Sequence, residues 1–184
     1  MANKIDPSLT QLHAENVRAQ LLTPGGFRLD AQIIGKIARG VPVFAGMTLE
    51  CLMSTLACAE NYPVRAGEAV FNEGDIGSAF YVLIAGEVVV QKQRNAEAVT
   101  LATLGPGECF GEMALVRNDV RSATVRATVN SVTMRFDRER VDENLQSAHM
   151  IYRNIARTLA ARLDVSSIML VDLVVQHKSS ALPQ

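Results

Sequence analysis

Residues 64–90 read VRAGEAVFNEGDIGSAFYVLIAGEVVV, and this stretch decides the fold. Short apolar runs alternate in it with glycine-containing turns, and seven of the twelve glycines in the chain lie between Pro63 and Glu112. Runs of β-branched and aromatic residues between turns are typical of strands. We expect strands at residues 69–71, 80–84, 88–90, 99–101, 124–128 and 132–136. Strands of this length and spacing predict an antiparallel β-roll, also described as a double-stranded β-helix or jelly roll.

The segments on both sides of this stretch carry helical patterns, so the predicted fold class is α+β. Asp30 can cap a helix with apolar residues at 33, 34 and 37, and Thr48 can cap one with apolar residues at 49, 52, 53 and 56. Residues 142–177 contain no glycine or proline. We therefore expect an N-terminal helical arm at residues 1–40 and a long C-terminal helical segment, followed by a tail at residues 178–184.

The C-terminal segment carries a stripe of mostly apolar positions spaced three or four residues apart. The positions are Tyr152, Ala156, Leu159, Leu163, Ser166, Leu170, Leu173 and His177. Such a heptad-like stripe is typical of a helix that pairs with a sister helix, which predicts a homodimer. The alternative is that the helix breaks near residues 164–167 and folds back on its own roll.

Charge and composition exclude several classes of function. Eighteen Lys and Arg against nineteen Asp and Glu give a net charge of −1, so no basic field supports direct nucleic-acid binding. The first twenty residues contain no apolar signal-peptide core, and Asp172 interrupts the apolar run at 168–175, so we expect neither export nor membrane insertion. Three cysteines without a C-x-x-C pair and three scattered histidines predict reduced thiols in the cytoplasm, with no metal site and no cofactor.

The sequence FGEMAL at residues 110–115, followed by Arg121, predicts an anion-binding site. Gly111 allows close approach of the backbone, and a short helical turn after it would direct free N–H groups toward an anion. In an extended segment, Arg121 would lie on the inward, otherwise apolar face. A guanidinium buried there needs an anion, which is either a bound ligand or the carboxylate of Glu112 in a bracing ion pair.

These residues resemble the cyclic nucleotide-binding domain family. The resemblance covers residues 41–163, implies a domain at residues 41–177, and joins four separated elements. They are Gly67-Glu68; Glu73-Gly74-Asp75 with Gly77; Phe80-Tyr81 with Gly86; and the phosphate-binding cassette at residues 110–125. The chain is similar to the effector domain of bacterial cyclic AMP receptor-type regulators. We expect no helix-turn-helix DNA-binding domain, because too few residues follow Gln176 to form one.

The resemblance implies roles for individual residues. Gly111 and the N–H groups after it would hold the cyclic phosphate, Glu112 would accept the ribose 2′-hydroxyl, and Arg121 would pair with an exocyclic phosphate oxygen. The implied ligand-binding residues are Phe110, Gly111, Glu112, Met113, Ala114, Arg121, Ser122 and Ala123. Four other glycines would instead serve turns and close packing of the roll: Gly67, Gly74, Gly77 and Gly86. Val120 departs from the proline that many members carry before the arginine.

The implied function is a cyclic nucleotide receptor. Members with alanine or serine after the arginine favour cyclic AMP, and threonine there is associated with cyclic GMP through a bond to the guanine amino group. Ser122 therefore favours cyclic AMP, but it keeps a hydroxyl, so cyclic GMP stays the alternative ligand. The C-terminal helices would relay binding to a sister subunit in a parallel homodimer, or to a protein output partner that the sequence does not identify. The alternative is a helical interaction or scaffold protein whose roll no longer binds nucleotide. We do not expect an enzyme, because no histidine lies between Asn61 and Arg140 and no catalytic motif is present.

Overall fold

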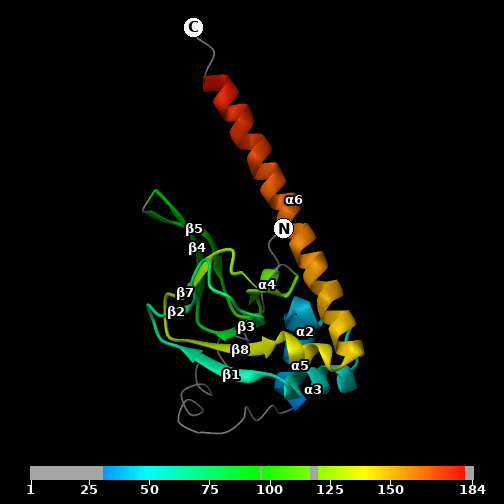
Figure 1. Ribbon diagram of the computed structural model, residues 1–184. Coiled ribbons are helices and arrows are strands. Elements are labelled where there is room, and N and C mark those ends of the chain that lie inside the picture. The colour runs from blue at the N-terminus through cyan, green and yellow to red at the C-terminus, as the bar shows by residue number, and fades with distance from the viewer. Residues whose placement is uncertain (1–30, 96, 117–119, 181–184) are drawn as a thin grey trace.

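The computed structural model describes residues 31–95, 97–116 and 120–180, which form a β-roll with helices along one side (Figure 1). The helices are α2 (Ala31–Gly40), α3 (Leu49–Ala57), α4 (Met113–Val116), α5 (Arg138–Asp142) and α6 (Leu145–Ser180), with a 3₁₀ turn η1 (Pro42–Phe44). The strands are β1 (Glu60–Val64), β2 (Ala69–Phe71), β3 (Ala79–Ala85), β4 (Val88–Arg94), β5 (Glu97–Leu104), β6 (Cys109–Phe110), β7 (Thr124–Ala127) and β8 (Ser131–Asp137). The predicted α+β roll with a long C-terminal helical segment is confirmed. The cap at Asp30, residues 1–30 of the arm and residues 181–184 of the tail lie outside the described residues.

Two four-stranded antiparallel sheets make up the roll within the described residues. Their strand orders are β1-β8-β3-β6 and β2-β7-β4-β5. Strand β3 is buried along nearly its whole length because its two faces serve two cores. Phe80 and Val82 pack with the helices, whereas Tyr81 and Leu83 face the interior between the sheets. Because successive side chains of β3 point to opposite faces, this strand packs against the helices on one face and against the interior of the roll on the other.

Side-chain caps start the two main helices. The Thr48 hydroxyl accepts a hydrogen bond from the Cys51 N–H at 3.2 Å, which confirms the predicted cap of α3. The Asn144 side-chain oxygen accepts from the Ser147 N–H at 3.0 Å and starts α6. The first half of α6 then packs on the roll, where Ile151 is completely buried.

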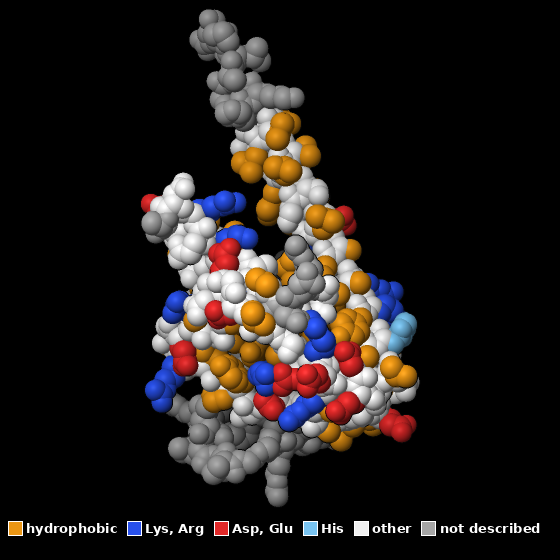
Figure 2. Space-filling view, viewed as in Figure 1, with side chains coloured by type: hydrophobic (Ala, Val, Ile, Leu, Met, Phe, Trp, Pro, Cys, Tyr) orange, Lys and Arg blue, Asp and Glu red, His pale blue; other side chains and the backbone are white. Residues whose placement is uncertain are grey.

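Helix α6 is continuous over 36 residues, so the alternative of a break at residues 164–167 is wrong. Ser166, whose polar side chain suggested the break, instead donates its hydroxyl to the Arg162 carbonyl at 2.9 Å within the helix. The second half of α6 projects beyond the roll (Figure 1). Its large apolar side chains are exposed (Figure 2): Val165, Ile168, Met169, Leu170, Val171, Leu173, Val174 and Val175.

Two strands lie where the sequence pattern did not predict them. Strand β1 is mostly polar and contains Pro63, and it lies at the edge of its sheet, where proline is tolerated. Strand β6 has only two residues, which is too short for any periodicity. Strand β5 is longer than the predicted run at 99–101, but seven of its eight residues are exposed, so burial imposes no alternation on it.

A substitution at Gly86 tests the close approach of β8 to the turn between β3 and β4. Gly86 has φ +95°, and a Cβ there would lie 2.2 Å from Ser131 Oγ and 2.7 Å from Ser131 Cα. We expect Gly86→Ala to lower the free energy of unfolding by about 3 kcal/mol, through left-handed backbone strain and overpacking. Urea denaturation measures the loss.

Gly67→Ala is the matched control, because Gly67 has φ +82° but no described atom within 4 Å of its Cβ position. This control should lose only about 1 kcal/mol from backbone strain. Equal losses in the two variants would show that the contact with Ser131 does not matter.

Candidate functional site

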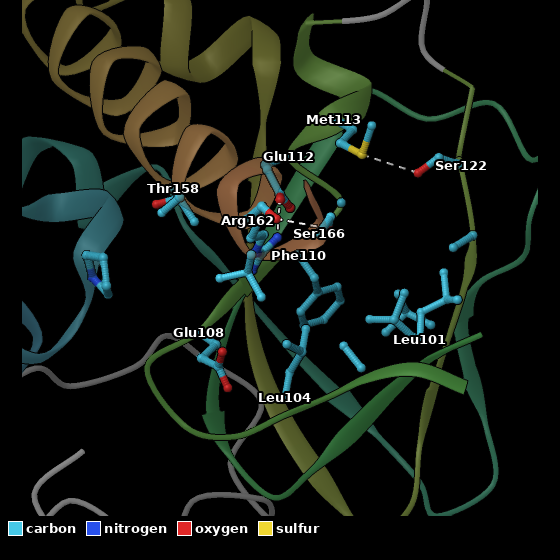
Figure 3. Close-up of a pocket in the computed structure, with 18 of the residues that line it drawn as sticks. Leu101, Leu104, Glu108, Phe110, Glu112, Met113, Ser122, Thr158, Arg162 and Ser166 are labelled. Carbon is cyan, nitrogen blue, oxygen red and sulfur yellow. Dashed lines mark hydrogen bonds and ion pairs between the residues drawn. The ribbon is translucent and has the colours of Figure 1, made fainter. Parts of the chain in front are cut away.

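A cavity of about 1070 Å³ lies between the roll and α6 (Figure 3). Residues of β4, β5, β6, α4 and α6 line it, together with the segment that leads into β7. The structure brings all eight residues implied by the resemblance to this one cavity: Phe110, Gly111, Glu112, Met113, Ala114, Arg121, Ser122 and Ala123.

Arg121 is held by uncharged groups on several sides. Its Nη1 donates to the Gly111 carbonyl at 2.9 Å. Its Cζ lies 4.2 Å from the centre of the Phe71 ring and 5.8 Å from that of Tyr81. The side chain precedes β7 rather than lying within it, but it still follows the inward alternation with Ala123. The whole residue is only 5% exposed.

Arg121 has no ion-pair partner within 4.0 Å in the described part of the chain. Burial lowers the pKa of Arg121, an effect that the charge of Arg135 reinforces and those of Tyr81, Asp75 and Glu112 oppose. A buried guanidinium without a nearby carboxylate is costly, so the site is prepared for an anion.

Glu112 is buried as well, but its partner is not the one considered from the sequence. Arg162 of α6 donates Nη1 to Glu112 Oε1 at 2.5 Å and Nη2 to the Cys109 carbonyl at 3.0 Å (Figure 3). The alternative of a bracing ion pair between Glu112 and Arg121 is therefore wrong. Burial raises the pKa of Glu112, and the positive charge of Arg162 opposes this rise. Figure 3 shows that the contact joins the cassette directly to the long helix.

The short helix α4 supplies fewer free N–H groups than expected. The Ala114 N–H bonds to the Gly111 carbonyl at 3.3 Å, and the Leu115 N–H bonds to the Glu112 carbonyl at 3.1 Å. These two donors are used within the turn itself, so they are not free to contact an anion. Gly111 has φ +75°, which only glycine adopts readily, and it makes the turn possible.

The other wall of the site contains a contact between two of the predicted residues. The Ser122 hydroxyl donates to the Met113 sulfur at 3.4 Å, across the cavity edge shown in Figure 3. Ser122 is exposed, unlike its neighbours Arg121 and Ala123. Its hydroxyl therefore lies at the rim and is engaged by a weak acceptor.

Sequence reasoning missed the contribution of α6 to the cavity. Thr158, Arg162 and Ser166 line it from this helix, and Leu101 lines it from β5. The spacing of four residues places the three α6 side chains on one helical face, a signal that was available. The heptad-like stripe includes Ser166 but passes beside Arg162, which lies on a neighbouring row of the helix.

A metal site, a reactive thiol and a membrane span find no support among the described residues. No three His, Cys, Asp or Glu side chains gather there to hold a metal ion. Burial, reinforced by the charge of Glu112, raises the pKa of Cys109 to about 12, so this thiol stays protonated. None of the described helices combines the length and apolarity needed to cross a membrane.

Comparisons with known proteins point to one family. Residues 63–148 match the family model described as cyclic nucleotide-binding domain. The chain is 32% identical over 126 residues to the cyclic AMP receptor protein of Thermus thermophilus, covering 68% of this chain and 58% of that protein. It is 38% identical over 93 residues to a cAMP-dependent protein kinase regulatory subunit of Schizosaccharomyces pombe, covering 50% of this chain and 22% of that protein.

The fold gives the same result. The crystal structure of the Thermus thermophilus catabolite activator protein matches with a TM-score of 0.67 at 30% identity, over 72% of this chain and 63% of that one. The chain thus spans less than two thirds of the length of each of these relatives. The matched residues include Gly111, Glu112 and Arg121. In sequence over residues 63–148 and in fold, this chain is similar to the cyclic nucleotide-binding domain family.

Proposed function

We propose that this protein is a receptor for a cyclic nucleotide, with cyclic AMP preferred over cyclic GMP, and that α6 transmits the binding event. The observation that carries the proposal is the buried Arg121 without a carboxylate partner in the described part of the chain. A cyclic phosphate would supply the missing anion, because a planar guanidinium makes charge-assisted hydrogen bonds to phosphate oxygens. Phe110, Met113, Ala114 and Ala123 would complete the walls around it.

Glu112 would bind the ribose. A carboxylate accepts hydrogen bonds and does not donate them, which suits a sugar 2′-hydroxyl. The contact between Arg162 and Glu112 favours the ionised, accepting form against the effect of burial. Glu112 is only 2% exposed, so a hydroxyl bound there would be shielded from water.

The base would lie toward β5 and the outer part of α6. Leu101, Val165 and Met169 give this part of the cavity apolar walls that suit a purine. The Ser122 hydroxyl donates to the sulfur of Met113, and its oxygen lone pairs remain acceptors, so this contact does not discriminate against a guanine amino group. The preference for cyclic AMP rests on serine rather than threonine at this position.

A binding role accounts for the cavity better than catalysis does. Its charged lining residues are Glu108, Glu112, Arg121, Arg157 and Arg162, an excess of one positive charge that suits one anion. No His or Cys is among the described residues that line it.

The location of the protein is inferred from its thiols. We infer a regulatory protein of the cell interior, where free thiols such as that of Cys51 remain reduced.

Helix α6 is the element that would transmit binding. Arg162 contacts both Glu112 and the Cys109 carbonyl, so a ribose at Glu112 would change the interactions that hold this helix. A ligand shifts a helix only if its affinity differs between two helix positions. The direct contact between Arg162 and the proposed ribose partner provides that difference.

The projecting half of α6 would pair with the same helix of a second copy, in parallel. Leu170 and Leu173 are each 62% exposed. They belong to the projecting half of α6, on which many hydrophobic side chains are exposed (Figure 2). Exposed apolar surface of this extent favours association. The proposed assembly is a homodimer. A protein output partner would bind to this homodimer or would compete with the second copy for the projecting half of α6. The rival function, a scaffold whose roll no longer binds nucleotide, does not account for the costly buried Arg121.

Removing the proposed phosphate ligand tests the function. Arg121→Ala should weaken cyclic AMP binding by about 2–5 kcal/mol, because a buried phosphate loses its charged partner. This is roughly thirtyfold to several thousandfold in Kd, measured by titration calorimetry. Arg94→Ala, which removes an exposed arginine in β4, should bind as the wild type does. Binding by Arg121→Ala within a few-fold of the wild type would place the phosphate elsewhere.

The raised pKa of Glu112 predicts a pH-dependent stability. The fold favours the neutral carboxyl, so the stability of the ligand-free protein falls as pH rises from the usual glutamate pKa of about 4.3 through the raised value. Glu112→Gln cannot ionise and lacks this loss. Its free energy of unfolding relative to the wild type should therefore rise over this range and then level off, as measured by urea denaturation across pH. A relative stability that falls over the range would mean that attraction to Arg162 outweighs burial.

Light scattering tests the assembly. We expect a dimer at micromolar concentration, and a monomer for Leu170→Glu combined with Leu173→Glu, because charges on both positions would be buried in the interface. The control is Leu49→Glu combined with Leu145→Glu, which changes two equally apolar and exposed side chains outside the projecting half. A wild-type monomer, or a dimer that survives the α6 substitutions, would remove this surface from the assembly.

A further inference from the structure

The space beside Gly77 is occupied by the Arg121 side chain. A Cβ on Gly77 would lie 2.9 Å from Nη2, 3.1 Å from Nε and 3.3 Å from Cζ of Arg121. The φ of Gly77 lies outside the left-handed region, unlike that of Gly74 or Gly86. The backbone at this position therefore suits any residue, and what requires glycine is the guanidinium beside it. The sequence pattern predicts that Gly77 serves packing of the roll. Its nearest neighbour is instead the guanidinium of Arg121, the proposed phosphate-binding group.

Phe71, at the end of β2, covers another side of the same guanidinium. Its ring centre lies 4.2 Å from Cζ, a distance at which a cation is attracted to an aromatic face. The ring is itself held by Tyr81 and Phe110, with centroids 5.8 Å and 6.1 Å away. The platform is therefore rigid before any ligand arrives.

Gly111 closes the enclosure at the Nη1 end. The Gly111 carbonyl accepts a hydrogen bond from Nη1, and a Cβ added to Gly111 would lie 2.7 Å from that nitrogen. An arginine side chain ordinarily has many rotamers, and ordering it on binding weakens affinity. In this protein the aromatic face of Phe71 and the absence of side chains on Gly77 and Gly111 order the guanidinium in advance, and no carboxylate of the described residues forms an ion pair with it.

We propose that Phe71 and Gly77 are positioning residues for the anion site, holding the Arg121 guanidinium where it meets the phosphate. The inference rests on the proposed function for its effect on binding, but the position of the guanidinium can be measured without ligand. Phe71→Leu removes the aromatic face and keeps an apolar side chain. Gly77→Ala adds one methyl group that displaces the guanidinium, and the flexible arginine can move aside without disturbing the backbone.

The first measurement is titration calorimetry of the full chain with cyclic AMP. Each variant should weaken binding roughly tenfold while keeping one cooperative urea-denaturation transition, which shows that the variant is folded in the binding experiment. Neither substitution should weaken binding further in an Arg121→Ala background, because a positioning residue acts only through the group that it positions. Gly105→Ala is the matched control: its Cβ would meet only Glu108 Oε2, at 4.0 Å, and it should bind as the wild type does.

The second measurement is the guanidinium proton resonance of Arg121 in the ligand-free protein, assigned by its loss in Arg121→Lys. Protons above an aromatic face are shifted upfield, so the resonance should move downfield in Phe71→Leu. It should also move in Gly77→Ala and stay in place in Gly105→Ala.

The outcomes separate this inference from the proposed function. A resonance that moves in both variants, with binding loss confined to the Arg121-containing background, supports the positioning role. An unmoved resonance, or equal losses with and without Arg121, would overturn it. If the wild type binds no cyclic nucleotide, the proposed function fails, and the resonance alone then supports or overturns the positioning role.

Discussion

The arrangement of this protein depends on one buried cation. Arg121 lies at the otherwise apolar inner wall of the roll, with an aromatic ring on one face, a carbonyl on one edge and glycine on two sides. β2, β6 and the turns before β3 and β7 must all meet for this to occur. The roll brings these segments together by pairing β2 with β7 and β3 with β6, although they are separate in sequence. The folded roll therefore holds the Arg121 guanidinium in one position.

The second buried charge links that site to the rest of the molecule. Glu112 follows Gly111 directly, yet its ion pair is with Arg162, fifty residues later in α6. Arg162 is partly exposed and Glu112 is not, so the pair lies where cavity, cassette and helix meet. In the proposed function, a change at the cassette would act on the helix whose far half carries exposed apolar side chains. Binding and assembly are connected in this account through one side chain rather than through a diffuse rearrangement.

Much of this could be predicted from sequence, for physical reasons. Glycines at turns, β-branched runs and the Thr48 cap act locally, so their signals survive without the fold. The eight cassette residues lie in one short stretch, so spacing and resemblance found them together. Arg162 and Phe71 were not found in the same way, because each reaches the site from a distant element. The four-residue spacing around Arg162 indicates a shared helix face but not which site that face lines. Gly77 was detected but assigned to the roll, since only the three-dimensional structure shows which atoms fill the space beside it. Helix α6 also continues through Ser166, whose hydroxyl bonds to the Arg162 carbonyl within the helix, a local contact that the stripe could not reveal.

The measurement that tests the central claim most directly is a crystal structure of the full chain with cyclic AMP. The account predicts the phosphate within hydrogen-bond distance of Arg121, still stacked on Phe71, with the ribose 2′-hydroxyl on Glu112. A nucleotide bound outside this cavity, or one whose phosphate leaves Arg121 without contact, would contradict it.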